Sequence, residues 1–298
     1  MNFSEDVNKA ICNISKDQRE LLSIYKIGSS VENTPMLAIN LGIGSKKILI
    51  NATHHAREMI NTILLLDQIQ YILNLYKKNS SVDNINIREL LHKVTLVFVP
   101  LVNPDGADLV LNGKYFLSNQ YKNMFYLQRN SFESWKSNIR GVDLNRNYPT
   151  KHPSNDTVNY PGPKGYTGPW YFSEPETSAL KDLTEFCLFE GSISYHSSGE
   201  EIYWQFNQSK EEKDRDLQIA KKISEETTYD LLPEEEINLG NGYKDWFIEN
   251  YKKPALTMEV SPYVGERKVP QKYYPQIFQQ NKNVPIIFAK EILKNCPN

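Results

Sequence analysis

The motif THHARE places two adjacent histidines, an arginine and a glutamate directly after an apolar run. Two further strand-like runs end in ionisable residues, because SYHSSGEE carries His196 and TMEVSP carries Glu259. Imidazoles and charges beside buried strands cost free energy, so their presence indicates a chemical role. Two histidines and a carboxylate, with a fourth position open, are the ligand set of a catalytic zinc ion. The sequence predicts a zinc site that uses Glu58, His196 and either His54 or His55, with Glu259 available to deprotonate water.

The other two of the five histidines have simpler interpretations. His92 precedes a strand in ELLHKVTL, and we interpret it as a surface or helix-end residue. His152 lies in the polar loop PTKHPSND without an acidic partner at ligand spacing, so a surface position is expected. Neither histidine is assigned to the predicted metal site.

Four apolar runs rich in β-branched residues predict buried strands, at residues 46–54, 93–103, 191–197 and 254–261. Because they are apolar almost throughout, we expect both faces of the sheet to be covered. Segments with helical periodicity alternate with them, namely NTILLLDQIQYILNLYKK, SEPETSALKDLTEFCLFE, EEKDRDLQIAKKISEETTY and YYPQIFQQNKNVPIIFAKEILKN. This order predicts a single-domain α/β fold with a mixed, mostly parallel twisted β-sheet flanked by helices. Ligands of such sheets bind at the carboxyl ends of strands, where the three motifs lie.

Charge, hydrophobicity and cysteine content indicate which classes of partner and which cellular location to expect. The chain has 298 residues and a formal net charge of -2, which argues against nucleic acid or an anionic membrane surface as partner. No apolar stretch approaches the roughly 18 residues of a membrane span. The N-terminal stretch is polar and acidic, unlike a signal peptide, so we expect a cytoplasmic protein. Cys12, Cys187 and Cys296 are odd in number and widely spaced, and we interpret them as reduced thiols.

Five sequence blocks, in this order along the chain, resemble those of the zinc metallocarboxypeptidases related to carboxypeptidase A: HARE, VPLVNPDG, GVDLNRNYP, SYHSSGE and TMEVSP. They lie between Asn51 and Pro262. The resemblance implies a carboxypeptidase-like fold, hydrolysis of peptides and a single zinc cofactor. It assigns a catalytic domain to residues 46–298, with residues 1–45 as an N-terminal extension packed on that domain or leading into it. The oligomeric state is not indicated.

The resemblance also assigns the metal ligands. In the HxxE pattern of the family, the ligand histidine precedes the glutamate by three residues, which selects His55 and Glu58 and leaves His54 as a supporting neighbour. His196 is the expected third ligand, and Glu259 is the expected catalytic base.

The substrate contacts follow from the same blocks. Arg146 is similar to the arginine that binds the free carboxylate of the substrate, with Asn145 beside it, and a planar guanidinium suits this role because it donates two parallel hydrogen bonds. Arg57 resembles a second, outer cationic contact of the family. Ser198 and Gly199, in the SYHSSGE block, are expected to line the substrate site.

Three positions depart from the family pattern. The arginine that polarises the scissile carbonyl usually lies nine residues before the motif asparagine, and this chain has Lys136 there, with Arg140 as a nearby rival. A tyrosine on a mobile loop has no counterpart in EEINLGNG, and Tyr243 is the nearest possible substitute. Lys244 occupies the specificity position, where it either binds an acidic group of the substrate or is an ordinary surface lysine.

The blocks HSSGEEIYWQF and WKSNIRGVDLNRNYP are most similar to a bacterial branch, the γ-D-glutamyl-meso-diaminopimelate peptidases. This branch implies a peptidoglycan peptide or muropeptide as substrate, and the absence of visible wall-binding repeats favours muropeptides. The alternative is a conventional metallocarboxypeptidase that releases C-terminal amino acids. A non-catalytic binding protein on the same fold is disfavoured, since the expected ligands and Glu259 are all present.

Overall fold

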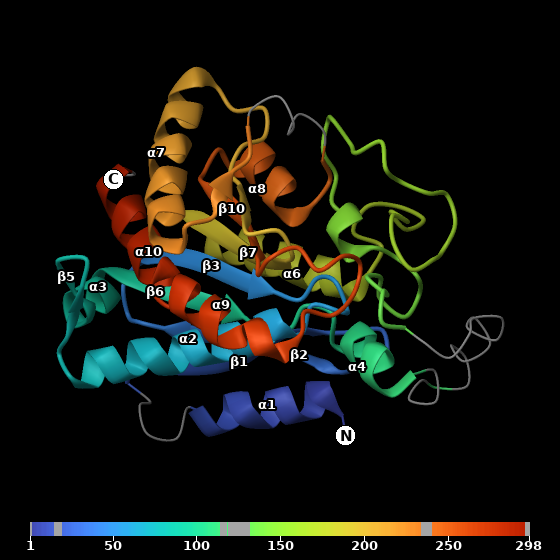
Figure 1. The fold of residues 1–298 in the computed structure, drawn as a ribbon, viewed down its shortest axis with the longest axis horizontal. Coiled ribbons are helices and arrows are strands. Elements are labelled where there is room, and N and C mark those ends of the chain that lie inside the picture. The colour runs from blue at the N-terminus through green and yellow to red at the C-terminus, as the bar shows by residue number, and fades with distance from the viewer. Residues whose placement is uncertain (1, 15–19, 114–117, 119–131, 234–239, 296–298) are drawn as a thin grey trace.

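The computed structural model describes residues 2–14, 20–113, 118, 132–233 and 240–295. Within them, an eight-stranded sheet runs through the middle of the molecule (Figure 1). Its strands, in spatial order, are β1 (Leu22–Ser29), β2 (Pro35–Leu41), β6 (Val94–Val99), β3 (Lys46–Ala52), β7 (Gly191–Ser197), β10 (Ala255–Val260), β8 (Glu201–Tyr203) and β9 (Asp230–Leu231). A separate small hairpin joins β4 (Ser81–Val82) and β5 (Ile85–Asn86).

The four central strands, β6, β3, β7 and β10, are parallel and are the four that the sequence predicts. The outer pairs β1–β2, β2–β6 and β8–β10 are antiparallel, and β9 is parallel to β8. The predicted mixed, mostly parallel α/β sheet is therefore confirmed. Its centre is apolar on both faces: Ile48 and Ile50 of β3 pack into one hydrophobic core, whereas Leu49 packs into the other.

Helices cover both faces of the sheet. The larger core is closed by α1 (Phe3–Ile14), α2 (Ile60–Lys77), α3 (Ile87–Lys93), α7 (Lys210–Thr227), α9 (Tyr274–Asn281) and α10 (Val284–Asn295). The smaller core, on the opposite face, is closed by α6 (Pro175–Cys187) and α8 (Tyr243–Tyr251). A ninth helix, α4 (Pro104–Asn112), follows β6 and lies beside α1 (Figure 1).

Helical periodicity predicts α2, α6 and α7 closely, and α7 begins with a capping box between Ser209 and Glu212. The last predicted helix is two helices, α9 and α10, and the break between them lies at residues 282 and 283. Pro285, in the first turn of α10, has no N–H to donate to the carbonyl of Asn281, and proline is tolerated in a first helical turn, which explains why a new helix begins here. The sequence interpretation missed α1, α3, α4, α8 and the β1–β2 hairpin.

The domain boundary expected between residues 45 and 46 falls in the turn between β2 and β3, two strands of one sheet. The boundary stays a prediction. Cys296 and most of the segment EEINLGNG lie outside the described residues. None of the helices in the described part of the chain is both long and apolar enough to cross a bilayer.

Glu176, in the first turn of α6, is a fully buried carboxyl group remote from the metal-site motifs in sequence. It accepts a hydrogen bond from the backbone N–H of Val31 (3.4 Å) and one from the amide of Asn138 (3.4 Å). Burial, together with the charges of Asp105 and Glu174, raises the pKa of Glu176 to about 8. The carboxyl group is therefore protonated in the folded protein at neutral pH.

This protonation predicts how stability depends on pH. In the unfolded chain the glutamate ionises near pH ~4.3, so the folded state holds an extra proton between that pH and about pH 8. The free energy of unfolding should consequently fall as pH rises through this window. A Glu176→Gln variant, which stays neutral, should lose this part of the pH dependence and exceed the wild type in stability at pH 8 by on the order of a few kcal/mol.

Thermal unfolding of both proteins from pH 5 to pH 8 measures the effect. Glu185→Gln, at an exposed carboxylate on the same helix, is the matched control and should leave the profile unchanged. Parallel pH profiles for Glu176→Gln and the wild type would contradict the prediction.

Candidate active site

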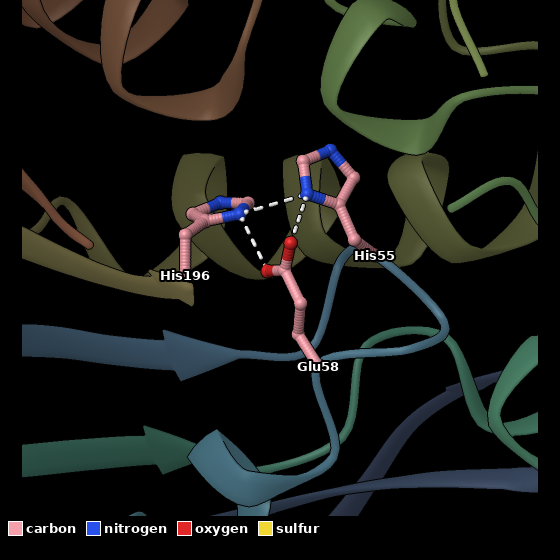
Figure 2. Close-up of side chains that lie close together, drawn as sticks. All are labelled: His55, Glu58 and His196. Atoms are coloured by element: carbon pink, nitrogen blue, oxygen red, sulfur yellow. Dashed lines mark hydrogen bonds and ion pairs between the residues drawn. The ribbon is translucent and has the colours of Figure 1, made fainter. Parts of the chain in front are cut away.

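Three side chains converge at the carboxyl ends of β3 and β7 (Figure 2). His55 Nδ1 lies 2.9 Å from Glu58 Oε1, and His196 Nδ1 lies 3.1 Å from both His55 Nδ1 and Glu58 Oε2. All three side chains are buried, with at most 7% of any of them exposed. Among the described residues, they are the one group of histidine, cysteine, aspartate and glutamate side chains with the spacing of a metal site.

The donor atoms of this group fit zinc. Imidazole nitrogens and a carboxylate oxygen are zinc ligands, and ligand bonds of about 2.0–2.1 Å in a tetrahedron separate the donor atoms by about 3.3 Å. The observed separations of 2.9–3.1 Å are close to that spacing. Burial opposes the charge of Glu58, but His55 and His196 outweigh it and hold the pKa of Glu58 well below its usual range. An ionised carboxylate and two imidazole nitrogens that face one another are stabilised by a shared cation.

A tight turn after β3 orients the ligands His55 and Glu58. Thr53 adopts a positive φ of 59°, which directs the chain out of the strand, and its hydroxyl contacts the Thr62 hydroxyl (2.8 Å). Asn103, fully buried after β6, donates from its amide to the carbonyl oxygens of His54 (2.9 Å) and Ser137 (3.2 Å). One side chain thereby joins the ligand turn to the segment that carries Lys136. The sequence interpretation missed this role, although Asn103 lies within the quoted VPLVNPDG block.

Asp143 positions His55 from behind. Its Oδ1 lies 3.4 Å from His55 Nε2, and its Oδ2 accepts a hydrogen bond from the N–H of Gly165 (2.9 Å). Although burial raises the pKa of Asp143, the adjacent His55 and more distant cations lower it further, so the carboxylate is ionised. A carboxylate on the far nitrogen fixes the ring orientation of a ligand histidine. Asp143 was also missed, despite its place in GVDLNRNYP.

His54 lies beside the ligand group but is not one of its converging donors. Its Nε2 lies 3.0 Å from the Tyr148 hydroxyl, and its ring stacks on that of His196 with 5.8 Å between centroids. Burial holds the pKa of His54 well below its ordinary value, so the ring is neutral. The placement agrees with the expected supporting position.

A cleft of about 310 Å³ opens beside the ligands, and its lining includes Lys136 and Glu259. Glu259 of β10 is the direct strand partner of His196 in β7. Burial raises the pKa of Glu259 to about 7, and the charge of Glu58 adds to the shift, whereas Lys136 and His196 oppose it. Ser198, Gly199 and Arg57 also line this cleft, as the sequence interpretation expects of substrate contacts.

Of the two candidates for the carbonyl-polarising cation, the structure brings only Lys136 into the cleft. Arg140 is absent from the lining, and its guanidinium lies 3.6 Å from the carboxylate of Glu174 on a partly exposed surface. Lys136 is therefore the one of the two candidates that lines this cleft.

At the start of α8, the structure places two predicted substrate contacts away from the cleft. Tyr243 is fully buried in the smaller core, and its hydroxyl contacts that of Thr184 (2.8 Å), so it does not reach the cleft. Lys244 is 4% exposed, and its ammonium group lies 2.5 Å from Asp245 Oδ1 and donates to the Gln205 carbonyl (2.8 Å). It is neither a surface lysine nor an uncompensated cation awaiting a substrate carboxylate.

Arg146 and Asn145 follow Asp143 in a short 3₁₀ turn. The guanidinium of Arg146 donates from Nε and Nη2 to both oxygens of Asp156, at 3.2 and 2.9 Å. Asn145 Oδ1 accepts the N–H of Tyr243 (3.0 Å) and so fixes the start of α8. Neither side chain lines the cleft described above. The arginine fork is formed and already holds a carboxylate, which is the type of group it is predicted to bind in the substrate.

The ligand geometry predicts that substitutions of the two adjacent histidines, His54 and His55, have different effects on zinc binding. Alanine at His55 or His196 should abolish stable zinc binding because each removes a converging nitrogen, whereas His54→Ala should retain the metal. Metal analysis after dialysis, with circular dichroism as a folding control, measures this. Zinc loss in His54→Ala together with retention in His55→Ala would reverse the assignment.

Comparisons with known proteins agree with this geometry. The chain is 33% identical over 258 residues to gamma-D-glutamyl-L-diamino acid endopeptidase 1 of Lysinibacillus sphaericus, covering 85% of this chain and 64% of that protein. It is 29% identical over 176 residues to carboxypeptidase A4 of Mus musculus, covering 58% of this chain and 38% of the relative. The chain thus spans less than two thirds of either relative. Among solved structures, the bovine thrombin-activatable fibrinolysis inhibitor superposes with a TM-score of 0.78 at 20% identity, covering 98% of this chain and 97% of that one. The family model described as zinc carboxypeptidase matches residues 7–282, and the chain belongs to this family.

Proposed function

We propose that this protein is a zinc metallopeptidase that hydrolyses the amide bond between γ-D-glutamate and meso-diaminopimelate in peptidoglycan peptides or muropeptides. The observation that carries the proposal is the 33% identity, over 85% of this chain, to an enzyme named as a γ-D-glutamyl-L-diamino acid endopeptidase. The convergent ligand group and the adjacent carboxylate supply the chemistry that such an enzyme needs. A cytoplasmic location, with muropeptides rather than intact wall as substrate, remains part of this proposal.

In the proposed reaction, His55, Glu58 and His196 hold zinc. When bound, the ion supplies Lewis-acid chemistry, polarising the scissile carbonyl and the attacking water. Glu259 accepts the proton of that water and later transfers it to the leaving amine. A carboxyl group with a pKa of about 7 suits both transfers, because its two protonation states differ little in free energy near neutral pH.

The cations orient the substrate. Lys136 lies in the same cleft as Glu259, where its ammonium group stabilises negative charge that develops on the carbonyl oxygen. Arg146, with Asn145 beside it, binds the terminal carboxylate of the substrate. The exposed carboxylate of Asp156 occupies the arginine fork in the substrate-free protein, and the substrate carboxylate replaces it. The side chain of Arg146 is 24% exposed and that of Asp156 is 64% exposed, so the exchange releases Asp156 to solvent while the guanidinium stays paired with a carboxylate.

A conventional metallocarboxypeptidase is the second candidate, and the similarity to carboxypeptidase A4 favours it. That match extends over a smaller part of this chain, 58% against 85%. The two candidates share the metal ligands and the base, so only the substrate separates them.

The role of Glu259 predicts a loss of turnover without loss of metal. Glu259→Gln removes the proton acceptor but keeps the size of the side chain, so kcat should fall by at least ~10²-fold, the usual scale of general-base catalysis. Zinc content should stay at the wild-type level because Glu259 is not one of the converging donors. Near-normal turnover in the variant would refute the assignment.

The substrate prediction is tested by mass spectrometry of defined peptides incubated with zinc-loaded protein. We expect release of meso-diaminopimelate from γ-D-glutamyl-meso-diaminopimelate, and much slower release of C-terminal residues from α-linked peptides. Glu259→Gln is the control for contaminating peptidases. Efficient trimming of the α-linked peptides, with the diaminopimelate peptide left intact, would favour the conventional carboxypeptidase instead.

A further inference from the structure

Arg57 is a buried cation in the wall of the cleft. Only 5% of the residue is exposed, yet it lines the same cavity as Lys136 and Glu259. Its Nη1 donates to the Ser134 carbonyl (3.0 Å), while its Nε is buried and has no hydrogen-bond partner. Throughout the described parts of the chain, no carboxylate forms an ion pair with this guanidinium.

Glu266, which lines the same cleft, is the acidic side chain whose pKa responds to the charge of Arg57. The positive charge of Arg57 contributes to lowering the pKa of Glu266, but the larger cause is its hydrogen bond with Lys164. Glu266 is thus already paired, with Lys164, and that pair is about half exposed at the rim of the cleft. Arg57 therefore lines the cleft with a guanidinium that has a buried donor without a partner and no carboxylate ion pair among the described residues.

An unpaired buried guanidinium is costly unless a ligand completes it. The planar fork of arginine matches a carboxylate, whose two oxygens accept parallel hydrogen bonds. Lys136, the other cation of this cleft, is assigned to the scissile carbonyl. Glu201, Glu259 and Glu266 also line the cleft, but none of these carboxylates forms an ion pair with Arg57 in the described structure. The guanidinium can therefore bind a carboxylate of the substrate other than the terminal one assigned to Arg146.

The two cations are held on one wall by the backbone. The Ala56 N–H donates to the Lys136 carbonyl (2.9 Å), and the Arg57 side chain donates to the Ser134 carbonyl two residues earlier. An anion bound by Arg57 consequently lies close to the carbonyl that Lys136 contacts. The terminal carboxylate on the amine side is assigned to Arg146, so we assign an anion on the acyl side of the scissile bond to Arg57.

A γ-linked glutamyl residue carries such an anion. Its α-carboxylate is separated from the scissile carbonyl carbon by three methylene or methine carbons, a span of roughly 5 Å at ordinary C–C bond lengths of about 1.5 Å. An α-linked acyl residue has a neutral amide and its own side chain in that region instead. We propose that Arg57 binds the α-carboxylate of the γ-linked D-glutamyl residue, and that this contact makes the cleft selective for γ-glutamyl substrates with a free α-carboxylate. This inference rests on the proposed function and adds Arg57 as the residue that recognises the glutamyl residue on the acyl side of the scissile bond.

The test compares two substrates in two enzymes. The substrates are γ-D-glutamyl-meso-diaminopimelate and its α-carboxamide analogue, γ-D-isoglutaminyl-meso-diaminopimelate, which has nearly the same shape without the charge. The enzymes are the zinc-loaded wild type and Arg57→Gln. Arg88→Gln, at an exposed arginine of α3, is the matched control for the loss of one positive charge.

We expect the wild type to prefer the free carboxylate by about 10–100-fold in kcat/KM, as for a charge-assisted hydrogen bond. Arg57→Gln should lose that factor on the glutamyl substrate and change little on the isoglutaminyl substrate, so that the preference disappears. Arg57→Lys should recover part of it, since the charge remains without the fork. An equal fall on both substrates would overturn the proposal, because Arg57 would then act on a part common to both.

The outcomes separate this inference from the proposed function. If the wild type releases diaminopimelate from neither substrate, the proposed function fails. If it cleaves both equally well, the function stands and the role of Arg57 is refuted. Zinc content and thermal unfolding are measured for each variant. If Arg57→Gln loses zinc, its activity cannot be used, and the test rests on the wild type and Arg57→Lys. The inference is then overturned if the wild type shows no preference for the free α-carboxylate.

Discussion

The parallel register of β3, β7 and β10 is the constraint on which the site depends. His196 pairs directly with Glu259, and Tyr195, the residue before His196, pairs with Ala52 at the end of β3. Since side chains alternate along a strand, direct partners point to the same face, and a slip of one residue would turn Glu259 away from the cleft. The register thus places the ends of the strands side by side, and the loops that follow carry the remaining ligands. Asn103 links the turn at His54 to the segment at Ser137 by hydrogen bonds to both carbonyl oxygens.

The carboxyl groups at the site differ in pKa because they have different neighbours. Glu58 and Asp143 face imidazoles, which keep them ionised despite full burial. Glu259 instead lies near Glu58 and Glu201, whose negative charges add to the effect of burial. One buried site thereby holds two carboxylates suited to bind or orient cationic groups and one suited to exchange a proton near neutral pH. Environments that separate the pKa values of similar groups are typical of acid–base catalysis.

The central strands and the metal ligands could be predicted from the sequence because their signals are local. Strands buried on both faces are continuous apolar runs, and the ligands stand at the ends of these runs. The edge hairpin β1–β2 and α1 lack this signal, since they are partly exposed at the border of the sheet. Spacing from a motif places Tyr243 and Lys244 near the site but does not determine where their side chains point. Burial of the first segment of α8 in the smaller core turns both inward, which depends on packing against α6 and β7.

The cations near the site differ in how easily they can exchange partners. Lys244 and Asp245 form a buried pair, and removing one partner from such a pair costs about 3–5 kcal/mol, so a substrate carboxylate does not compete for this lysine. Arg146 is paired with an exposed aspartate, which a substrate carboxylate can replace while the guanidinium stays paired. Arg57 needs no exchange, because no carboxylate of the described chain pairs with it. The cleft therefore offers Arg57 to a negatively charged group of the substrate, whereas the lysine at the expected specificity position stabilises the folded structure.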